Sequence, residues 1–148
     1  MKRPGRKRSR DPKVERLSHL QLFSNCSNSD LKHIARLTTE IDVRAGKVLM
    51  RQGDPGRECF VIEEGKAKAT IRGKRAHLMG PGECFGELAL LHSAPRAATV
   101  TAETDMRVVV LDSREFSSLL ESVPSVAKNV LAAIAERLRE TEGKQPHH

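Results

Sequence analysis

The sequence predicts a mainly β fold, an antiparallel sandwich or barrel with short helices at both ends. Between Thr38 and Leu111 the chain is a succession of short segments rich in strand-forming residues, separated by glycines. No long helical segment interrupts them, which favours antiparallel pairing. Helical spacing of apolar residues occurs before and after this region, so the helices are expected to flank the strands.

Two apolar segments with a polar turn between them predict two short helices before the strands. The first lies within residues 14–23, and the second, within residues 31–37, has helical spacing. Ser27 with Asp30, or Ser29 alone, can cap the second helix.

The glycines between the strands are interpreted as turn residues. In Asp54-Pro55-Gly56, proline presets φ and glycine accepts a positive φ. The glycines assigned in this way are Gly46, Gly53, Gly56, Gly65, Gly73, Gly80 and Gly82. Turn geometry explains them without a ligand.

Two helices are expected after the strands. Asp112 and Glu115 have the spacing of a capping box and begin the first helix. Pro124 suits the first turn of the second helix. The expected apolar stripe of that helix is Val126, Val130, Ile134 and Leu138, with Leu131 beside it.

The net charge of +7 comes almost entirely from the N-terminal segment. Six of the chain's 26 bases lie in residues 1–10, which hold no acid, so 20 bases face 19 acids in the rest. We therefore expect a disordered basic tail at residues 1–12, a folded domain at 13–142 and a disordered C-terminus at 143–148. The folded domain shows no charge excess typical of a nucleic-acid-binding surface, although the tail can contact nucleic acid or an anionic membrane.

Three separated cysteines, Cys26, Cys59 and Cys84, fit reduced thiols and carry no metal-binding spacing. The six histidines are scattered, so no metal is expected. The N-terminus lacks the apolar stretch of a secretory signal and no segment reaches membrane-spanning length. We expect a cytoplasmic protein.

The segment FGELALLHSAPRAATV, residues 85–100, combines an apolar run with two isolated charges, Glu87 and Arg96. ELALL can form one helical turn after a strand, and the first N–H groups of such a turn attract an anion. Arg96 has a planar fork suited to two phosphate oxygens, and small residues around it leave room for a bound group. A carboxylate beside that anion needs neutral donors, such as sugar hydroxyls. Together these groups suit a phosphorylated ribose.

This segment resembles the phosphate-binding cassette of cyclic-nucleotide-binding domains, and it is most similar to that of the regulatory subunits of cyclic-AMP-dependent protein kinase. The resemblance extends from about Leu17 to Leu138, with glycine-marked strands in the expected order. It implies an eight-stranded antiparallel β-roll, jelly-roll-like, with N-terminal helices and two C-terminal helices.

The resemblance also implies the roles of the binding residues. Glu87 would accept from the ribose 2′-hydroxyl, helped by the Gly86 N–H, and Arg96 would pair with the cyclic phosphate. The implied ligand-binding set is Gly86, Glu87, Leu88, Ala89, Arg96, Ala97, Ala98 and Thr99. Members selective for cyclic GMP often have threonine where this chain has Ala97, so the ligand is expected to be cAMP rather than cGMP.

Other interpretations concern the two charges of the cassette, its apolar side chains and the residues that cover the base. Glu87 and Arg96 could instead form a direct buried ion pair in a roll that binds nothing, although such pairs add little stability. The side chains of Phe85, Leu88, Leu90 and Leu91 are expected to pack in the core and hinge. The base could be covered by Arg137, Leu138 or Arg139, since no aromatic residue follows Phe116.

The sequence therefore predicts a stand-alone, non-catalytic cyclic-nucleotide sensor that acts on an effector in trans, because no reader domain follows the last helix. That helix could also form a homodimer. A DNA-associated regulator that uses the basic tail is the alternative. An enzyme such as a phosphodiesterase is not expected, since the sequence has no clustered His/Asp set.

Overall fold

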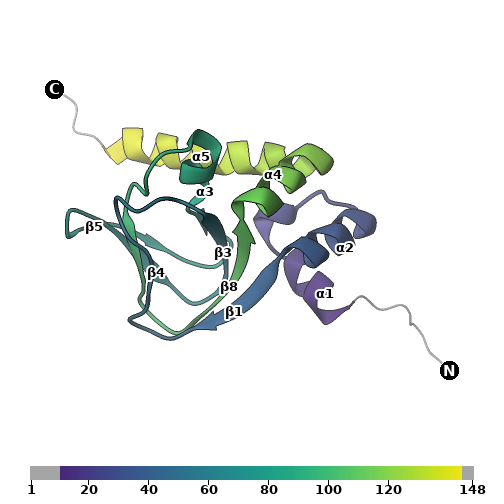
Figure 1. The fold of residues 1–148 in the computed structure, drawn as a ribbon, viewed down its shortest axis with the longest axis horizontal. Coiled ribbons are helices and arrows are strands. Elements are labelled where there is room, and N and C mark those ends of the chain that lie inside the picture. Colours follow the sequence, from purple (N-terminus) through teal and green to yellow (C-terminus); the bar gives the residue numbers. More distant parts are fainter. Residues whose placement is uncertain (1–10, 145–148) are drawn as a thin grey trace.

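Helices flank the series of strands, as the sequence predicts, and one short helix at residues 87–92 lies within it (Figure 1). The computed structural model describes residues 11–144. Its helices are α1 (Pro12–Ser18), η1 (Gln21–Phe23), α2 (Asn28–Leu37), α3 (Glu87–His92), α4 (Ser113–Ser122) and α5 (Pro124–Lys144). Its strands are β1 (Thr39–Val43), β2 (Val48–Met50), β3 (Glu58–Glu64), β4 (Ala67–Ile71), β5 (Lys74–Met79), β6 (Cys84–Phe85), β7 (Thr99–Ala102) and β8 (Met106–Asp112). The predicted tails at residues 1–10 and 145–148 lie outside the described residues.

The eight strands form two four-stranded antiparallel sheets, which confirms the β-roll. One sheet has the order β1-β8-β3-β6 and the other β2-β7-β4-β5. Every pairing within them is antiparallel. Strands distant in sequence are neighbours in space, as in a jelly roll.

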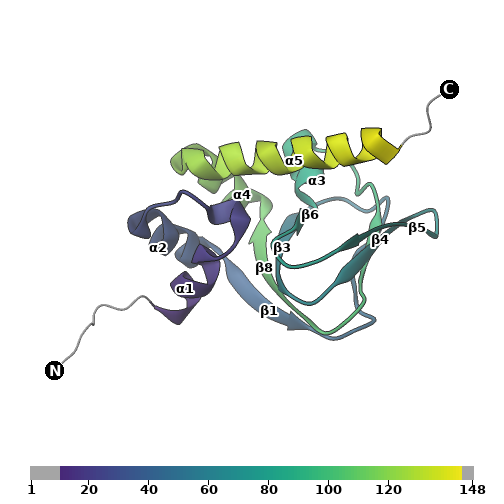
Figure 2. The same ribbon diagram turned by 180° about the vertical axis from the view of Figure 1, so that it is seen from behind.

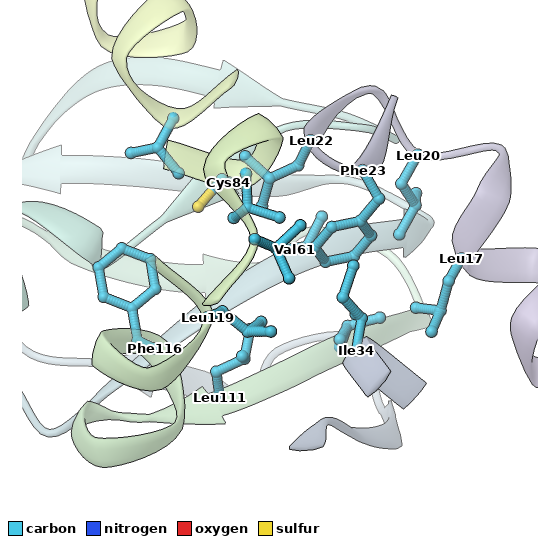
Figure 3. Packing of buried hydrophobic residues seen from close by; sticks show 14 of the residues in the cluster. Leu17, Leu20, Leu22, Phe23, Ile34, Val61, Cys84, Leu111, Phe116 and Leu119 are labelled. Atoms are coloured by element: carbon cyan, nitrogen blue, oxygen red, sulfur yellow. The ribbon is translucent and has the colours of Figure 1, made fainter. Parts of the chain in front are cut away.

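The first sheet separates two hydrophobic clusters, because successive residues of a strand face opposite sides. Val108 and Val110 of β8 face the interior of the roll, whereas Val109 and Leu111 face the helices. Figure 3 shows the cluster on the helical side, where side chains from both ends of the chain meet the sheet. The helices are therefore anchored on one face of the sheet, and the roll encloses the other.

The predicted helix starts are confirmed at two capping boxes. Ser27 accepts from the Asp30 N–H at 3.0 Å and begins α2, and Asp112 accepts from the Glu115 N–H at 2.7 Å and begins α4. Pro124 is the first residue of α5. Helix α5 runs past α4 and α3 in both views of the ribbon (Figures 1 and 2).

The predicted apolar stripe of α5 is correct only in its first half. Val126 and Val130 are buried and Ile134 packs at the edge of the core, but Leu138 is 62% exposed. Leu131 is 66% exposed. Asn129 donates to the carbonyls of Leu22 and Ser24 around η1, so this part of α5 is held against the helical cluster, to which Leu131 and Leu138 do not belong. Among the described residues, no helix combines the length and apolar character needed to cross a membrane.

Candidate functional site

A cavity of about 520 Å³ opens between the second sheet, the cassette and α5. Apolar side chains of the sheet form one wall: Met50, Ala69, Ile71, Met79 and Val100. The cassette forms the opposite wall, and Arg137 and Glu140 of α5 border it. The volume lies within the usual range of small-molecule sites, and the lining combines an apolar surface with a few charged groups.

The structure brings seven of the eight predicted ligand-binding residues to this cavity. They are Gly86, Glu87, Leu88, Ala89, Arg96, Ala97 and Ala98. Thr99 does not line it: it lies on β7, and its hydroxyl accepts from the Gln52 N–H at 2.9 Å. A ligand role for Thr99 stays a prediction.

Gly86 connects β6 to α3 at a point where only glycine fits. Its φ is +87°, in the left-handed region. A Cβ there would also lie 2.7 Å from Nη1 of Arg96 and 3.0 Å from the carbonyl oxygen of Glu58. The sharp turn therefore starts α3 directly against the arginine.

Arg96 is only 6% exposed and is held by its backbone and side chain. Its N–H donates to the Asp54 carbonyl at 2.8 Å, and its Nη1 donates to the Gly86 carbonyl at 3.1 Å. Burial lowers the pKa of Arg96, but a guanidinium stays protonated in proteins. None of the ion pairs among the described residues includes Arg96. A buried cation of this kind favours the binding of an anion.

Glu87 is 1% exposed and pairs with Arg137 of α5, not with Arg96. Its Oε2 accepts from Nη2 of Arg137, and its Oε1 accepts from Sγ of Cys84 at 3.7 Å. The direct Glu87–Arg96 pair considered from the sequence is therefore not formed. Arg137 was one of three expected base-covering residues, but no sequence signal identifies its partner 50 positions away.

Gly56 is a packing residue, which corrects its interpretation as a positive-φ turn residue. Gly53 has the positive φ, +90°, and Gly56 does not. A Cβ on Gly56 would lie 2.2 Å from Cβ of Ala89. The segment also forms an isolated bridge from Pro55 to Pro95. The β2–β3 connection therefore packs directly against the cassette.

The expected packing of the cassette leucines is wrong for two of them. Leu88 is 47% exposed and Leu91 is 46% exposed, because α3 is short and turns Ala89 toward the protein. Phe85 is buried as expected and stacks on Phe60, with ring centroids 4.9 Å apart. Leu90 packs at the edge of the helical cluster.

The apolar wall of the cavity was missed by sequence reasoning. Its residues come from β2, β4, β5 and β7, with His77 beside them. These are ordinary strand residues, and only sheet pairing brings them together. Their one weak signal is the alternation that places them on the inner face of the roll.

Comparisons with known proteins agree with this geometry. The family model of the cyclic nucleotide-binding domain matches residues 40–123. The chain is 28% identical over 132 residues to the CRP-like cAMP-activated global transcriptional regulator of Mycobacterium tuberculosis, covering 86% of this chain and 59% of the regulator. It is 36% identical over 107 residues to the cAMP-dependent protein kinase type II regulatory subunit of Drosophila melanogaster, covering 72% of this chain and 28% of the subunit.

The solved structure of cAMP-bound PfPKA-R has a TM-score of 0.74 and 28% identity, covering 86% of this chain and 44% of that one. The chain thus spans less than two thirds of the length of each of these three relatives. The residues that match the family model include the strands of the roll and the cassette beside the cavity. The chain belongs to the cyclic nucleotide-binding domain family.

Proposed function

We propose that the protein is a regulatory cAMP sensor. The observation that carries this proposal is that a buried arginine and a buried glutamate, Arg96 and Glu87, border one cavity with an apolar opposite wall. Arg96 binds the cyclic phosphate, with the N–H groups of Ala89 and Ala97. Glu87 accepts from the ribose 2′-hydroxyl, and the apolar wall takes the purine.

Ala97 and the relatives of this chain both favour cAMP over cGMP. Ala97 borders the cavity and has no hydroxyl to donate to a guanine. The names of the relatives described above refer to cAMP in each case. We therefore assign the preference to cAMP, with cGMP as the weaker ligand.

The pair between Glu87 and Arg137 supports a signalling mechanism. Arg137 of α5 pairs with the carboxylate of Glu87, which is also the proposed acceptor for the ribose 2′-hydroxyl. The ligand and α5 therefore interact with the same side chain. A ligand shifts the position of α5 only by binding one arrangement better than the other. The protein therefore acts by changing a surface, and the domain itself does no chemistry.

The exposed leucines of α5 offer that surface. Leu131 and Leu138 lie seven residues apart, which is the spacing of one helical face. We propose that this face contacts an effector protein or a second copy of the chain. The unpaired cysteines support a reducing, cytoplasmic location.

A calorimetric titration of the unmodified protein with cAMP and with cGMP tests the proposal. We expect binding of both, with cAMP the tighter ligand, and a reversed or reduced preference in Ala97→Thr. Silence with both nucleotides would instead support the roll as a protein-interaction module without a ligand.

The alternative of a DNA-associated regulator concerns residues 1–10, outside the described residues. This alternative is supported by the similarity to the CRP-like cAMP-activated global transcriptional regulator. Deleting residues 1–10 should then abolish salt-sensitive DNA binding. A full-length chain that binds no DNA contradicts this alternative and leaves the sensor proposal intact.

A further inference from the structure

A cysteine lies directly beneath the glutamate of the cassette. Cys84 is on β6, three residues before Glu87, and its Sγ is 3.7 Å from Oε1 of Glu87. Cys84 is 8% exposed and belongs to the helical cluster, where Figure 3 shows its sulfur among apolar side chains. The thiol therefore has one polar neighbour on the ligand side.

The thiol is a hydrogen-bond donor under ordinary conditions. The neighbouring Cys59, burial and the negative charge of Glu87 all raise the pKa of Cys84 above its usual value. A thiol that stays protonated can donate its S–H, and a carboxylate can only accept. The direction of the hydrogen bond is thus from Cys84 to Glu87.

The two oxygens of Glu87 have partners on different parts of the molecule. Oε2 accepts from Arg137 on α5, whose side chain is 34% exposed. Oε1 accepts from Cys84, which is paired with Val61 across β6 and β3. A displacement of α5 removes the first partner but leaves the second, because β6 is part of the roll.

We propose that Cys84 is a positioning residue for nucleotide binding: its S–H orients the Glu87 carboxylate so that the remaining acceptor sites of Glu87 face the ribose. This inference rests on the proposed function. A carboxylate has about four acceptor sites, so Glu87 can accept hydrogen bonds from the thiol and from a sugar hydroxyl at the same time. Because the thiol is neutral, it orients Glu87 without reducing the negative charge of the carboxylate. A second cation in its place would neutralise that charge.

The test compares two nucleotides on four proteins: wild type, Cys84→Ala, Cys84→Val and Cys84→Ser. Ala removes the donor and some volume, Val fills the volume without a donor, and Ser restores a donor of similar shape. Isothermal titration calorimetry measures the affinity for cAMP and for 2′-deoxy-cAMP, which lacks the hydroxyl that Glu87 receives.

We expect Cys84→Ala and Cys84→Val to weaken cAMP binding about five-fold, in line with the loss of one hydrogen bond. Both should leave the affinity for 2′-deoxy-cAMP unchanged, and Cys84→Ser should restore cAMP binding. Equal weakening for both nucleotides, or a Ser variant as weak as Ala, overturns the positioning role.

A spectroscopic measurement tests the contact without a ligand. The S–H stretching band of Cys84, assigned by difference from Cys84→Ala, should lie at low frequency and move upward in Glu87→Gln. An unmoved band overturns the contact. If wild type binds neither nucleotide, the proposed function fails and the positioning role with it, while the band still decides whether Cys84 donates to Glu87.

Discussion

Two arginine–glutamate pairs join helices to the roll, and they differ in what surrounds the glutamate. Arg137 of α5 pairs with Glu87, which is 1% exposed, and Arg16 of α1 pairs with Glu40, whose side chain is 13% exposed. Arg16 holds Glu40 through both carboxylate oxygens, with Nε to Oε2 at 2.9 Å and Nη2 to Oε1 at 2.6 Å. The α1 pair uses both oxygens of its glutamate, whereas the α5 pair leaves Oε1 of Glu87 to a thiol.

The surroundings decide the roles of the two pairs. Glu87 borders the cavity of about 520 Å³, which the buried Arg96 also lines. Glu40 instead faces a second carboxyl group, Glu63, whose oxygens are buried and accept no hydrogen bond from the part of the chain that is described. The same pair of residue types thus borders a cavity in one place and joins α1 to β1 in the other. A charge pair indicates a binding site only where it borders a cavity.

The largest expected effect is on cAMP affinity, which should depend on an arginine that lines the cavity and not on Arg16 of the α1–β1 pair. Arg96→Ala should weaken cAMP binding by about 2–5 kcal/mol, because it removes the proposed charge-assisted partner of the phosphate from a buried position. Arg16→Ala is the matched control and should leave the affinity unchanged, since Arg16 does not line the cavity. Calorimetric titration measures both. Equal affinity of wild type and Arg96→Ala would contradict the assignment.

A smaller effect compares the two pairs in the free protein. Arg137→Ala leaves the buried carboxylate of Glu87 without its cation and should lower the free energy of unfolding by about 2 kcal/mol. Arg16→Ala should lower it less, because Arg16 is the more exposed of the two arginines and Glu40 is nearer to solvent. Urea unfolding of both variants measures the difference. A larger loss in Arg16→Ala would reverse the comparison.

The smallest effect is on the pH dependence of stability, and it concerns Glu40 and Glu63 beside Arg16. Burial and the neighbouring Glu40 raise the pKa of Glu63 to about 7, and the hydrogen bond from Arg16 lowers the pKa of Glu40 to about 2. Since the folded pKa of Glu63 lies above its ordinary 4.5, its stabilising contribution is complete below pH 4.5 and is lost as pH rises through 7.

Glu63→Gln should therefore stabilise the protein by about 1 kcal/mol at pH 8, a figure reduced for partial solvent screening, and should change little at pH 4.5. Glu40 has the opposite sign: its contribution is present above pH 4.5 and is lost as pH falls through 2. Urea unfolding at a series of pH values measures both. A stability gain in Glu63→Gln that does not vary between pH 4.5 and 8 would refute this account.

Much of the site could be predicted because its signals are local. The cassette occupies one short segment, and its turn, its helix and its arginine follow each other within ten residues of Glu87. The caps at Ser27 and Asp112 are local too, since each involves a residue three positions away. Short-range hydrogen bonds of this kind are visible in the order of residues.

The sequence by itself therefore determined the mainly β fold, the flanking helices and the cassette with Glu87 and Arg96. Tertiary structure decided the rest: that Arg137 rather than Arg96 pairs with Glu87, that Gly56 is a packing residue, and that Leu88 and Leu91 are exposed. The physical reason is that ion pairing, close packing and burial depend on which distant segments meet. The order of residues along one segment does not specify which distant segments it will contact.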